Sequence, residues 1–391
     1  MTAAPRYVLI ANPGTKRCET YRAELLAYWR DVHGTTPNLE VVPWVEVIAR
    51  DGNLDDLPAF DAPAIVRMES PGKDDAATRA LLAAGARDDP SEPPHDWLSL
   101  EIPKGLLVRP GLLYRGFHRV LRGLRASFDA RPHLHPTACP LAVAEMFDKT
   151  RTCEKLDAAG VPVPETVDHS IHSSEFLFKT LYFRFKWPTV YVKLNTGSSA
   201  TGIVVLHLGE DRTAFSESAF GVTTLAHLND DFYNSRLVRR VTDLELEAAL
   251  QFLIREGAIV QRGIPMAQID GQNFDIRVVC LYGKPVATIF RLSPHPMTNL
   301  HLGGRRGDYD RCRAAIPTRE WLDALDHCAE AASCFDSAVA GVDLLFERGF
   351  RRHYVLEVNA FGDFFPGWTN AHGRSIHSLE AEASFARLCG S

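Results

Sequence analysis

The sequence predicts a two-part protein of mixed α/β and α+β class. The chain has 391 residues, which exceeds one average domain, so two or three substructures around a large core are expected. In the first third, strand-like apolar runs alternate with helix-like runs, a pattern typical of a parallel, Rossmann-like sheet. From about residue 170 β-hairpins dominate instead, which predicts a boundary between residues 135 and 170.

The expected elements of the first part follow from apolar spacing. YVLIANPG is predicted to be a buried strand ending in a turn, and an amphipathic helix follows near Cys18 to Arg30. The next stretches are the apolar LEVVPWVEV and AIVRMESPG and then the helix-like DDAATRALLAAG. After them, RDDPSEPPHD is predicted to be a surface loop. AIVRMESPG ends a predicted strand, where α/β sheets commonly place ligand loops. Arg67 and Glu69 are therefore candidate substrate contacts, with a structural role as the alternative.

A strongly amphipathic helix is predicted next, with its apolar face between Leu113 and Phe128. Arg115, Arg119 and Arg122 occupy another face of the same helix. These arginines either meet an acidic ligand or form an ordinary solvated surface, and the sequence favours the solvated surface.

Composition excludes several classes of protein. The net charge of −6 gives no overall attraction to nucleic acid or anionic membranes. No apolar run approaches the ~18 residues of a membrane span, and YVLIA is too short for a secretory signal, so a cytoplasmic location is expected. The eight cysteines form no CxxC pair, so neither a zinc site nor a disulfide framework is predicted.

The stretch TVYVKLNTGSSATGIVVLHL predicts two strands, near residues 189–194 and 203–208, around a glycine-rich loop. Glycines allow consecutive backbone N–H groups to face an anion, and hydroxyls add donors. A strand rather than a helix follows the loop, so it is not a Walker loop. Lys193 lies on an otherwise apolar strand and must snorkel, pair or bind an anion. The loop residues are Gly197, Ser198, Ser199, Thr201 and Gly202, and an ordinary flexible turn is the alternative.

AVAGVDLLF and HYVLEVN predict a hairpin whose turn is centred near Phe350. Asp343 then lies opposite Glu357, and Asn359 shares the face of Glu357 because strand side chains alternate. Two carboxylates and an amide oxygen on one patch suit Mg²⁺ or Mn²⁺. The alternative is a chance pair of carboxylates, each satisfied by an arginine, with Arg351 and Arg352 nearby in the sequence.

NFDIRVVCLYGKPVATIFRLSPHPMTNLHLGG predicts two strands around the turn YGKP. Arginines on apolar strands need anionic partners, and a transferring phosphoryl group would supply them. Arg277, Arg291 and Asn299 are the candidate donors, with a salt bridge from Arg277 to Asp275 as the rival.

These motifs together resemble the ATP-grasp superfamily, and the catalytic half is similar to its ribosomal-protein-modifying glutamate ligase branch. FDKTRTCEKLDAAGVPVPET, YVKLNTGSSATG, DIRVVCLYGKPVATIFR, TNLHLGG, AGVDLL and LEVNAFG follow the order of that family over about residues 138 to 362. The chain also resembles a bacterial ATP-grasp subgroup. The resemblance implies a Rossmann-like domain over 1–137 and an ATP-grasp domain over 138–391, with a lid subdomain at about 165–262 and a metal-binding subdomain at about 263–391.

Residue by residue, the resemblance implies the following site. Lys149 and Lys193 contact the ATP phosphates, and the glycine-rich hairpin closes over them. A hinge at Gln261, Arg262 and Gly263 pairs with adenine. Asp343, Glu357 and Asn359 hold Mg²⁺, with Mn²⁺ as an option, while Arg277, Arg291 and Asn299 act on the transferring phosphate or the substrate carboxylate. Leu194 and Ala200 depart from the usual proline and glycine, and Arg262 stands where an acidic residue is common, which leaves the ribose contact unassigned.

The implied activity is ATP-dependent ligation of a carboxylate to an amine through an acyl phosphate, with release of ADP and phosphate. The partners would be a small-molecule or peptide carboxylate and an amine acceptor, without nucleic acid or membrane, and the resemblance allows a homodimer. Two alternatives stay open. A phosphotransferase on the same ATP site would need no amine, and a nucleotide-binding module would not turn ATP over.

Overall fold

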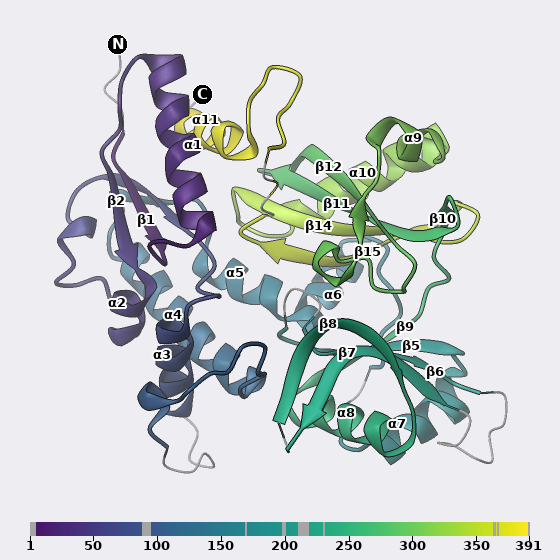
Figure 1. The fold of residues 1–391 in the computed structure, drawn as a ribbon. Helices are drawn as coiled ribbons and strands as arrows, with labels where there is room; N and C mark the ends of the chain where they lie inside the picture. The colour runs from purple at the N-terminus through teal and green to yellow at the C-terminus, as the bar shows by residue number, and fades with distance from the viewer. Residues whose placement is uncertain are drawn as a thin grey trace.

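The structure is a computed structural model of the chain that describes residues 5–87, 95–168, 170–197, 201–209, 219–229, 231–362, 365 and 367–389. Three sheets organise these residues (Figure 1). One is the N-terminal parallel sheet, and the other two are antiparallel sheets that face each other across a cavity.

The N-terminal part is a four-stranded parallel sheet with strand order β2-β1-β3-β4. Its elements are β1 (Tyr7–Ala11), α1 (Lys16–His33), β2 (Leu39–Pro43), α2 (Trp44–Ala49), η1 (Pro58–Phe60), β3 (Ala64–Met68), α3 (Asp75–Ala86), η2 (Trp97–Ser99), α4 (Pro110–Asp129) and β4 (Leu134–Pro136). Tyr7 and Leu9 pack on the α1 side, whereas Val8 and Ile10 pack with α2 to α4 on the other side. Burial of both faces explains why β1 is apolar at every position.

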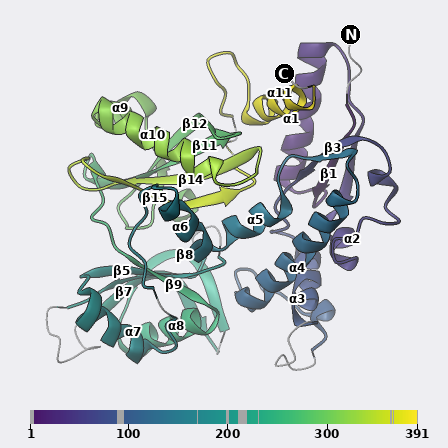
Figure 2. The ribbon, with the colours of Figure 1, turned by 180° about the vertical axis from the view of Figure 1, so that it is seen from behind.

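The last helix, α11 (Ile376–Leu388), lies beside α1 in both views (Figures 1 and 2). The rings of Trp29 and Phe385 meet edge to face at 4.9 Å between centroids. The end of the chain therefore returns to cover the N-terminal sheet, a contact between distant segments that no local pattern in the sequence predicts.

Two helices, α5 (Pro140–Phe147) and α6 (Lys149–Ala158), lead into the second sheet, whose strand order is β8-β7-β6-β5-β9. Its elements are α7 (Ser174–Thr180), η3 (Leu181–Phe185), β5 (Thr189–Leu194), β6 (Ile203–His207), β7 (Phe220–Leu228), β8 (Asp231–Val241), α8 (Asp243–Arg255) and β9 (Ala258–Arg262). Val190 and Val192 pack on the helix-covered face of this sheet. Because side chains alternate along a strand, Tyr191 and Lys193 point to the opposite face, toward the third sheet.

The third sheet has the order β13-β12-β11-β14-β15, with β10 beside β11. Its elements are β10 (Gln268–Ile269), β11 (Gln272–Leu281), β12 (Lys284–Ser293), η4 (Leu300–Leu302), β13 (Arg305–Arg306), α9 (Tyr309–Ala314), α10 (Thr318–Ser333), β14 (Val339–Phe346) and β15 (His353–Ala360). Phe274, Ile276 and Val342 pack in the core that includes α10. The intervening residues, among them Asp275, Arg277 and Asp343, point to the face that meets the second sheet.

The fold class and most elements predicted from the sequence are confirmed. All three predicted strand pairs form, as β5–β6, β11–β12 and β14–β15, and the amphipathic helix is α4. LEVVPWVEV is a single stretch in sequence but splits at Pro43 into β2 and α2. All eight cysteines are free. Within the described ranges, no helix is long and apolar enough to cross a membrane.

Candidate functional site

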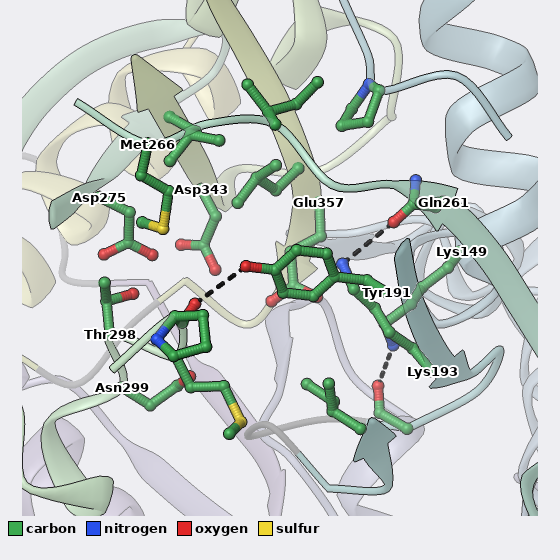
Figure 3. Close-up of a pocket in the computed structure, with 18 of the residues that line it drawn as sticks. Lys149, Tyr191, Lys193, Gln261, Met266, Asp275, Thr298, Asn299, Asp343 and Glu357 are labelled. Atoms are coloured by element: carbon green, nitrogen blue, oxygen red, sulfur yellow. Dashed lines mark hydrogen bonds between the residues drawn. The ribbon is translucent and has the colours of Figure 1, made fainter. Parts of the chain in front are cut away.

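Two cavities that share lining residues lie at the third sheet, the inner one between it and the second sheet. The inner cavity has a volume of about 90 Å³ and is lined from both sheets, as Figure 3 shows. The outer cavity, of about 310 Å³, opens toward the N-terminal part of the chain. The residues that line both are Lys149, Gly197, Arg291, Asn299 and Glu357. The predicted phosphate, metal and transfer residues therefore meet at one place.

Two lysines point into the inner cavity from different elements (Figure 3). Lys149 is the first residue of α6, after the N-cap Asp148, whose carboxylate accepts from the backbone N–H of Arg151 at 3.1 Å. The ammonium of Lys149 donates to the carbonyl of Gly197, and that of Lys193 donates to Oε1 of Gln261 at 3.0 Å. Burial lowers the pKa of both lysines, and the Glu357 carboxylate partly offsets this. An anion bound between them would restore the favoured charged state.

The predicted hinge is β9 and the residues after it. Its backbone donors are partly used, because the N–H of Arg262 donates to Glu165 at 2.8 Å and that of Gly263 donates to Thr189 at 2.8 Å. Gln261 and Arg262 line the inner cavity, as does Ile264, while Gly263 is not in the lining. The hinge is therefore positioned at the cavity, but Gly263 acts as a packing residue: a Cβ there would lie 2.7 Å from the Thr189 side chain.

The glycine-rich loop joins β5 to β6 at the mouth of the inner cavity. Gly197 lines both cavities, and Gly202 has a positive φ of 64° beside Leu194. Ser198 and Ser199 lie outside the described residues.

Asp343 and Glu357 lie directly opposite each other on β14 and β15, as the hairpin register predicted. Asn359 Nδ2 donates to Oε1 of Glu357 at 3.1 Å. The Asp343 carboxylate accepts from Nη2 of Arg277 at 3.0 Å and lies 3.0 Å from Nη2 of Arg291. Burial alone would raise the pKa of Asp343, but these two guanidinium groups hold it well below its usual range.

The donor set suits a hard divalent cation. Glu357 lines both cavities and accepts a hydrogen bond from Asn359 Nδ2 at 3.1 Å. With Asp343 and the Asn359 amide oxygen it offers oxygen ligands alone, the preference of Mg²⁺. The arginine partners of Asp343 are Arg277 and Arg291 rather than the Arg351 considered from the sequence.

The arginines form a buried ladder on the third sheet. Arg291 stands opposite Asp275 in the β11–β12 register, and its Nε donates to Asp275 Oδ1 at 2.7 Å. Arg277 bonds Asp343 instead, so the predicted rival pairing of Arg277 with Asp275 is wrong. The reason is that Asp275 and Arg277 alternate on one face of β11, where each meets the residue opposite it on a neighbouring strand.

The structure adds residues that the sequence reading missed. Tyr191, Met266, Asp275 and Thr298 line the inner cavity, and the Tyr191 hydroxyl donates to the carbonyl of Pro296 at 3.1 Å. Tyr191 was detectable, since it lies two residues before Lys193 on the same face of a strand.

Two other candidates do not join this site. Arg67 and Glu69 are only 2% exposed and line neither cavity, so the structural alternative holds for them. Arg115, Arg119 and Arg122 line a separate cleft beside α4, where Arg119 Nη2 lies 3.0 Å from Oδ2 of Asp51.

Solved structures share this architecture across their full length. The ATP-grasp ligase PsnB with a minimal precursor aligns with a TM-score of 0.53 at 14% identity, covering 98% of this chain and 100% of PsnB. The D-cycloserine synthetase DcsG aligns with a TM-score of 0.52 at 14% identity, covering 98% and 99%. D-alanine–D-alanine ligase from Bacillus anthracis with ATP gives 0.52 at 12% identity, covering 100% and 99%. These likenesses establish the fold, which is that of ATP-grasp ligases.

No curated protein matches the sequence significantly. A family model described as YheC/D-like ATP-grasp matches residues 139–340, just over half of the chain, from α5 to β14. This range includes the two cavity lysines, the hinge and the arginine ladder. The chain belongs to the YheC/D-like ATP-grasp family.

Proposed function

We propose that this protein is an ATP-dependent carboxylate–amine ligase that works through an acyl phosphate. The observation that carries the proposal is the convergence of Lys149, Lys193, Arg291 and the Asp343–Glu357 pair on two cavities that share lining residues. Cations for phosphates, oxygen ligands for a divalent ion and a second chamber for other reactants are the parts that this chemistry requires. The named neighbours PsnB, DcsG and D-alanine–D-alanine ligase are ligases or synthetases, which agrees with it.

In the proposed reaction, a substrate carboxylate oxygen attacks the γ-phosphorus of ATP and ADP leaves. The amine then attacks the acyl carbon, phosphate leaves, and the amine loses a proton to give the amide. Lys149 and Lys193 would hold the phosphates, and Arg277, Arg291 and Asn299 would stabilise charge on the transferring group. Gln261 and Arg262 of the hinge would hold the adenine end, while Gly263 packs against Thr189 beside them, and Gly197 and Gly202 would shape the loop over the phosphates.

Asp343, Glu357 and Asn359 would hold Mg²⁺, for which Mn²⁺ is a substitute. Held by these three side chains, a hard divalent cation would supply neutralisation of charge on the ATP phosphates. A solved PsnB structure that contains Mg and ADP aligns with a TM-score of 0.55 at 14% identity, which supports this choice.

The proposed partners are a small-molecule or peptide carboxylate and an amine acceptor. PsnB structures contain a precursor peptide, so peptides belong among the candidates tested. We also propose a division at residues 137/138, with the lid subdomain near 165–262 and the metal-binding subdomain from about 263. The C-terminal helix α11 packs back on the first part.

The test is ADP and phosphate release from MgATP with pooled amino acids and short peptides, with products read by mass spectrometry. A ligase needs both carboxylate and amine and gives a product one water lighter than the pair. Glu357→Gln should reduce turnover about 100-fold or more, because it removes a carboxylate at the phosphates. Glu347→Gln, on the turn of the same hairpin and outside both cavities, is the matched control. A phosphorylated product formed without amine would show a kinase, and nucleotide binding without turnover would show a binding module.

A further inference from the structure

The outer cavity is strongly cationic where it approaches the N-terminal part of the chain. Its described lining carries a single carboxylate, Glu357. The cationic side chains in the lining are Arg17, Lys149, Arg277, Arg291 and Arg306. Arg277 and Arg291 are neutralised by Asp343 and Asp275. The remaining arginines are Arg17 of α1 and Arg306 of β13, and neither lines the inner cavity that the hinge residues line.

Arg17 enters the outer cavity from α1, a helix of the N-terminal part. Its Nε donates to Oε2 of Glu69 at 2.8 Å, and its Nη2 donates to the carbonyl of Phe361 at 2.9 Å. Its Nη1 makes no hydrogen bond in the described part of the chain, and the side chain is 30% exposed. Two of its three nitrogens are therefore fixed by the protein, and the third is left for a ligand.

A buried ionic network holds Glu69, and thereby Arg17, in place. Arg67 pairs with Glu69, and its Nε donates to Oε1 of Glu380 on α11 at 2.7 Å. The Arg67 guanidinium also stacks on Tyr21, 4.1 Å from the ring centroid. Arg67, Glu69 and Glu380 are at most 2% exposed. Removing these charges from water costs free energy, so the network adds little to the stability of the fold. Its clearest effect is to fix the position of the Arg17 guanidinium at the wall of the cavity.

Arg306 is the second arginine of the pair and comes from the third sheet. It lies on β13, opposite Arg291, and is exposed. No ion pair compensates it within the described ranges, whereas its neighbour Arg305 donates to Gln272 at 3.0 Å on the surface. A cation facing a cavity without a counter-charge is suited to an anionic ligand.

We propose that Arg17 and Arg306 bind a non-reacting carboxylate of the amine substrate, so that the acceptor is a free α-amino acid or a peptide with its carboxylate close to its amine. This inference rests on the proposed function, because it concerns the second substrate of the ligase. The carboxylate takes the free Nη1 of Arg17 and the guanidinium of Arg306. Its amine then faces Glu357 and the arginine ladder, where the acyl phosphate forms. Arg67, Glu69 and Glu380 act as positioning residues.

Binding is measured first, independently of turnover. The thermal midpoint of the full chain with MgADP is measured under three conditions. These are added pooled α-amino acids, the same amino acids added as α-amides, and no addition. A rise with the amino acids and none with the amides is expected. An equal response to both pools would overturn the proposal.

Arg306→Met is the main variant, since an exposed residue can be replaced without risk to folding, and Arg305→Met is its matched control. The loss of one charge-assisted hydrogen bond should raise KM for the amine about 10- to 100-fold, with KM for ATP within about twofold. Arg306→Lys should recover part of the loss. Arg17→Met should act in the same way, with Arg22→Met on the surface of α1 as control.

The outcomes separate the two proposals. Turnover with normal amine KM in Arg306→Met and Arg17→Met would overturn the carboxylate subsite and leave the ligase intact. Carboxylate binding lost in both variants, without any turnover in the wild type, would support the subsite and overturn the ligase. Neither binding nor turnover with any free amino acid or peptide would overturn both.

Discussion

Lys149 and Lys193 show how single residues define the inner cavity. Their ammonium groups donate to a backbone carbonyl and to an amide oxygen, which are both neutral acceptors. Among the carboxylates, Glu357 has the largest favourable charge interaction with each lysine. Burial lowers the pKa of each lysine, so the unliganded cavity is an unfavourable place for two positive charges. A polyphosphate relieves this cost, and binding of ATP should therefore be sensitive to either lysine.

Lys193→Met is expected to raise KM for ATP about 10- to 100-fold, because it removes a charged hydrogen bond of about 1.5–3 kcal/mol at a phosphate. Lys179→Met, which removes an exposed lysine paired with Glu175, should leave KM unchanged. Nucleotide binding is measured by titration with a fluorescent ATP analogue. Equal affinities in the two variants would contradict a phosphate role for Lys193.

At the residue scale, the sequence predicts partners that are close along the chain and misses distant ones. Asp343 and Glu357 were paired correctly because a hairpin turn fixes their register. Arg17 was missed because its partner Phe361 lies 344 residues away, and no local pattern encodes that contact. The sequence predicts Arg291 as a donor, but its bond to Asp275 depends on the β11–β12 register, which an irregularity at Val279 and Cys280 shifts.

At the element scale, the turn between β5 and β6 depends on Gly202. Its φ of 64° is the left-handed region that side chains disfavour, and a Cβ would lie 2.5 Å from Leu194 Cδ1. Gly202→Ala should therefore shift the hairpin and weaken ATP binding about tenfold or more, at a conformational cost of about 1–2 kcal/mol. Gly271→Ala also has a positive φ, 73°, but no neighbour within 4 Å and no place in either cavity, so it serves as the control. The measurement is KM for ATP, and equal effects would contradict the prediction.

The contact between α10 and β15 predicts a pH dependence of stability. His327 Nδ1 and His353 Nε2 are 2.7 Å apart, and burial, together with the charge of His327, lowers the pKa of His353 from 6.5 to about 4 despite nearby Asp323. Between these values the unfolded chain binds a proton at His353 and the folded chain does not. Stability should therefore fall as the pH decreases from 6.5 toward about 4.

His353→Gln should show a smaller loss of urea midpoint than the wild type between about pH 7 and pH 5, because it removes the group that protonates only on unfolding. His372→Gln, at an exposed loop position, should behave like the wild type. An identical pH dependence in His353→Gln and the wild type would contradict the role of His353 in the loss of stability at low pH.

At the scale of the whole molecule, the order of motifs predicts the fold class of the N-terminal part and of the part that follows. How the two parts pack on each other is seen only in the structure. Local periodicity identifies strands and helices, since it reflects which face is buried. It does not say that α11 returns to α1, or that α1 supplies a wall of a cavity built mainly by the third sheet. Ion pairs between distant residues accompany both contacts, since Arg67 of β3 pairs with Glu380 of α11 and Arg17 of α1 pairs with Glu69, and such pairs carry no periodic signal.

The Arg67–Glu380 pair should make the two ends of the chain unfold together. Glu380→Gln leaves Arg67 with one carboxylate instead of two in a nearly inaccessible site, and such losses cost about 3–5 kcal/mol. Glu382→Gln, two residues on and 48% exposed beside Arg374, should cost less than about 1 kcal/mol. Urea denaturation followed by circular dichroism measures both. Because Glu69 would relax with Arg67, Glu380→Gln should also raise KM for the amine while leaving KM for ATP unchanged. A destabilised variant with both KM values unchanged would show that α11 only supports the N-terminal sheet and does not position Arg17.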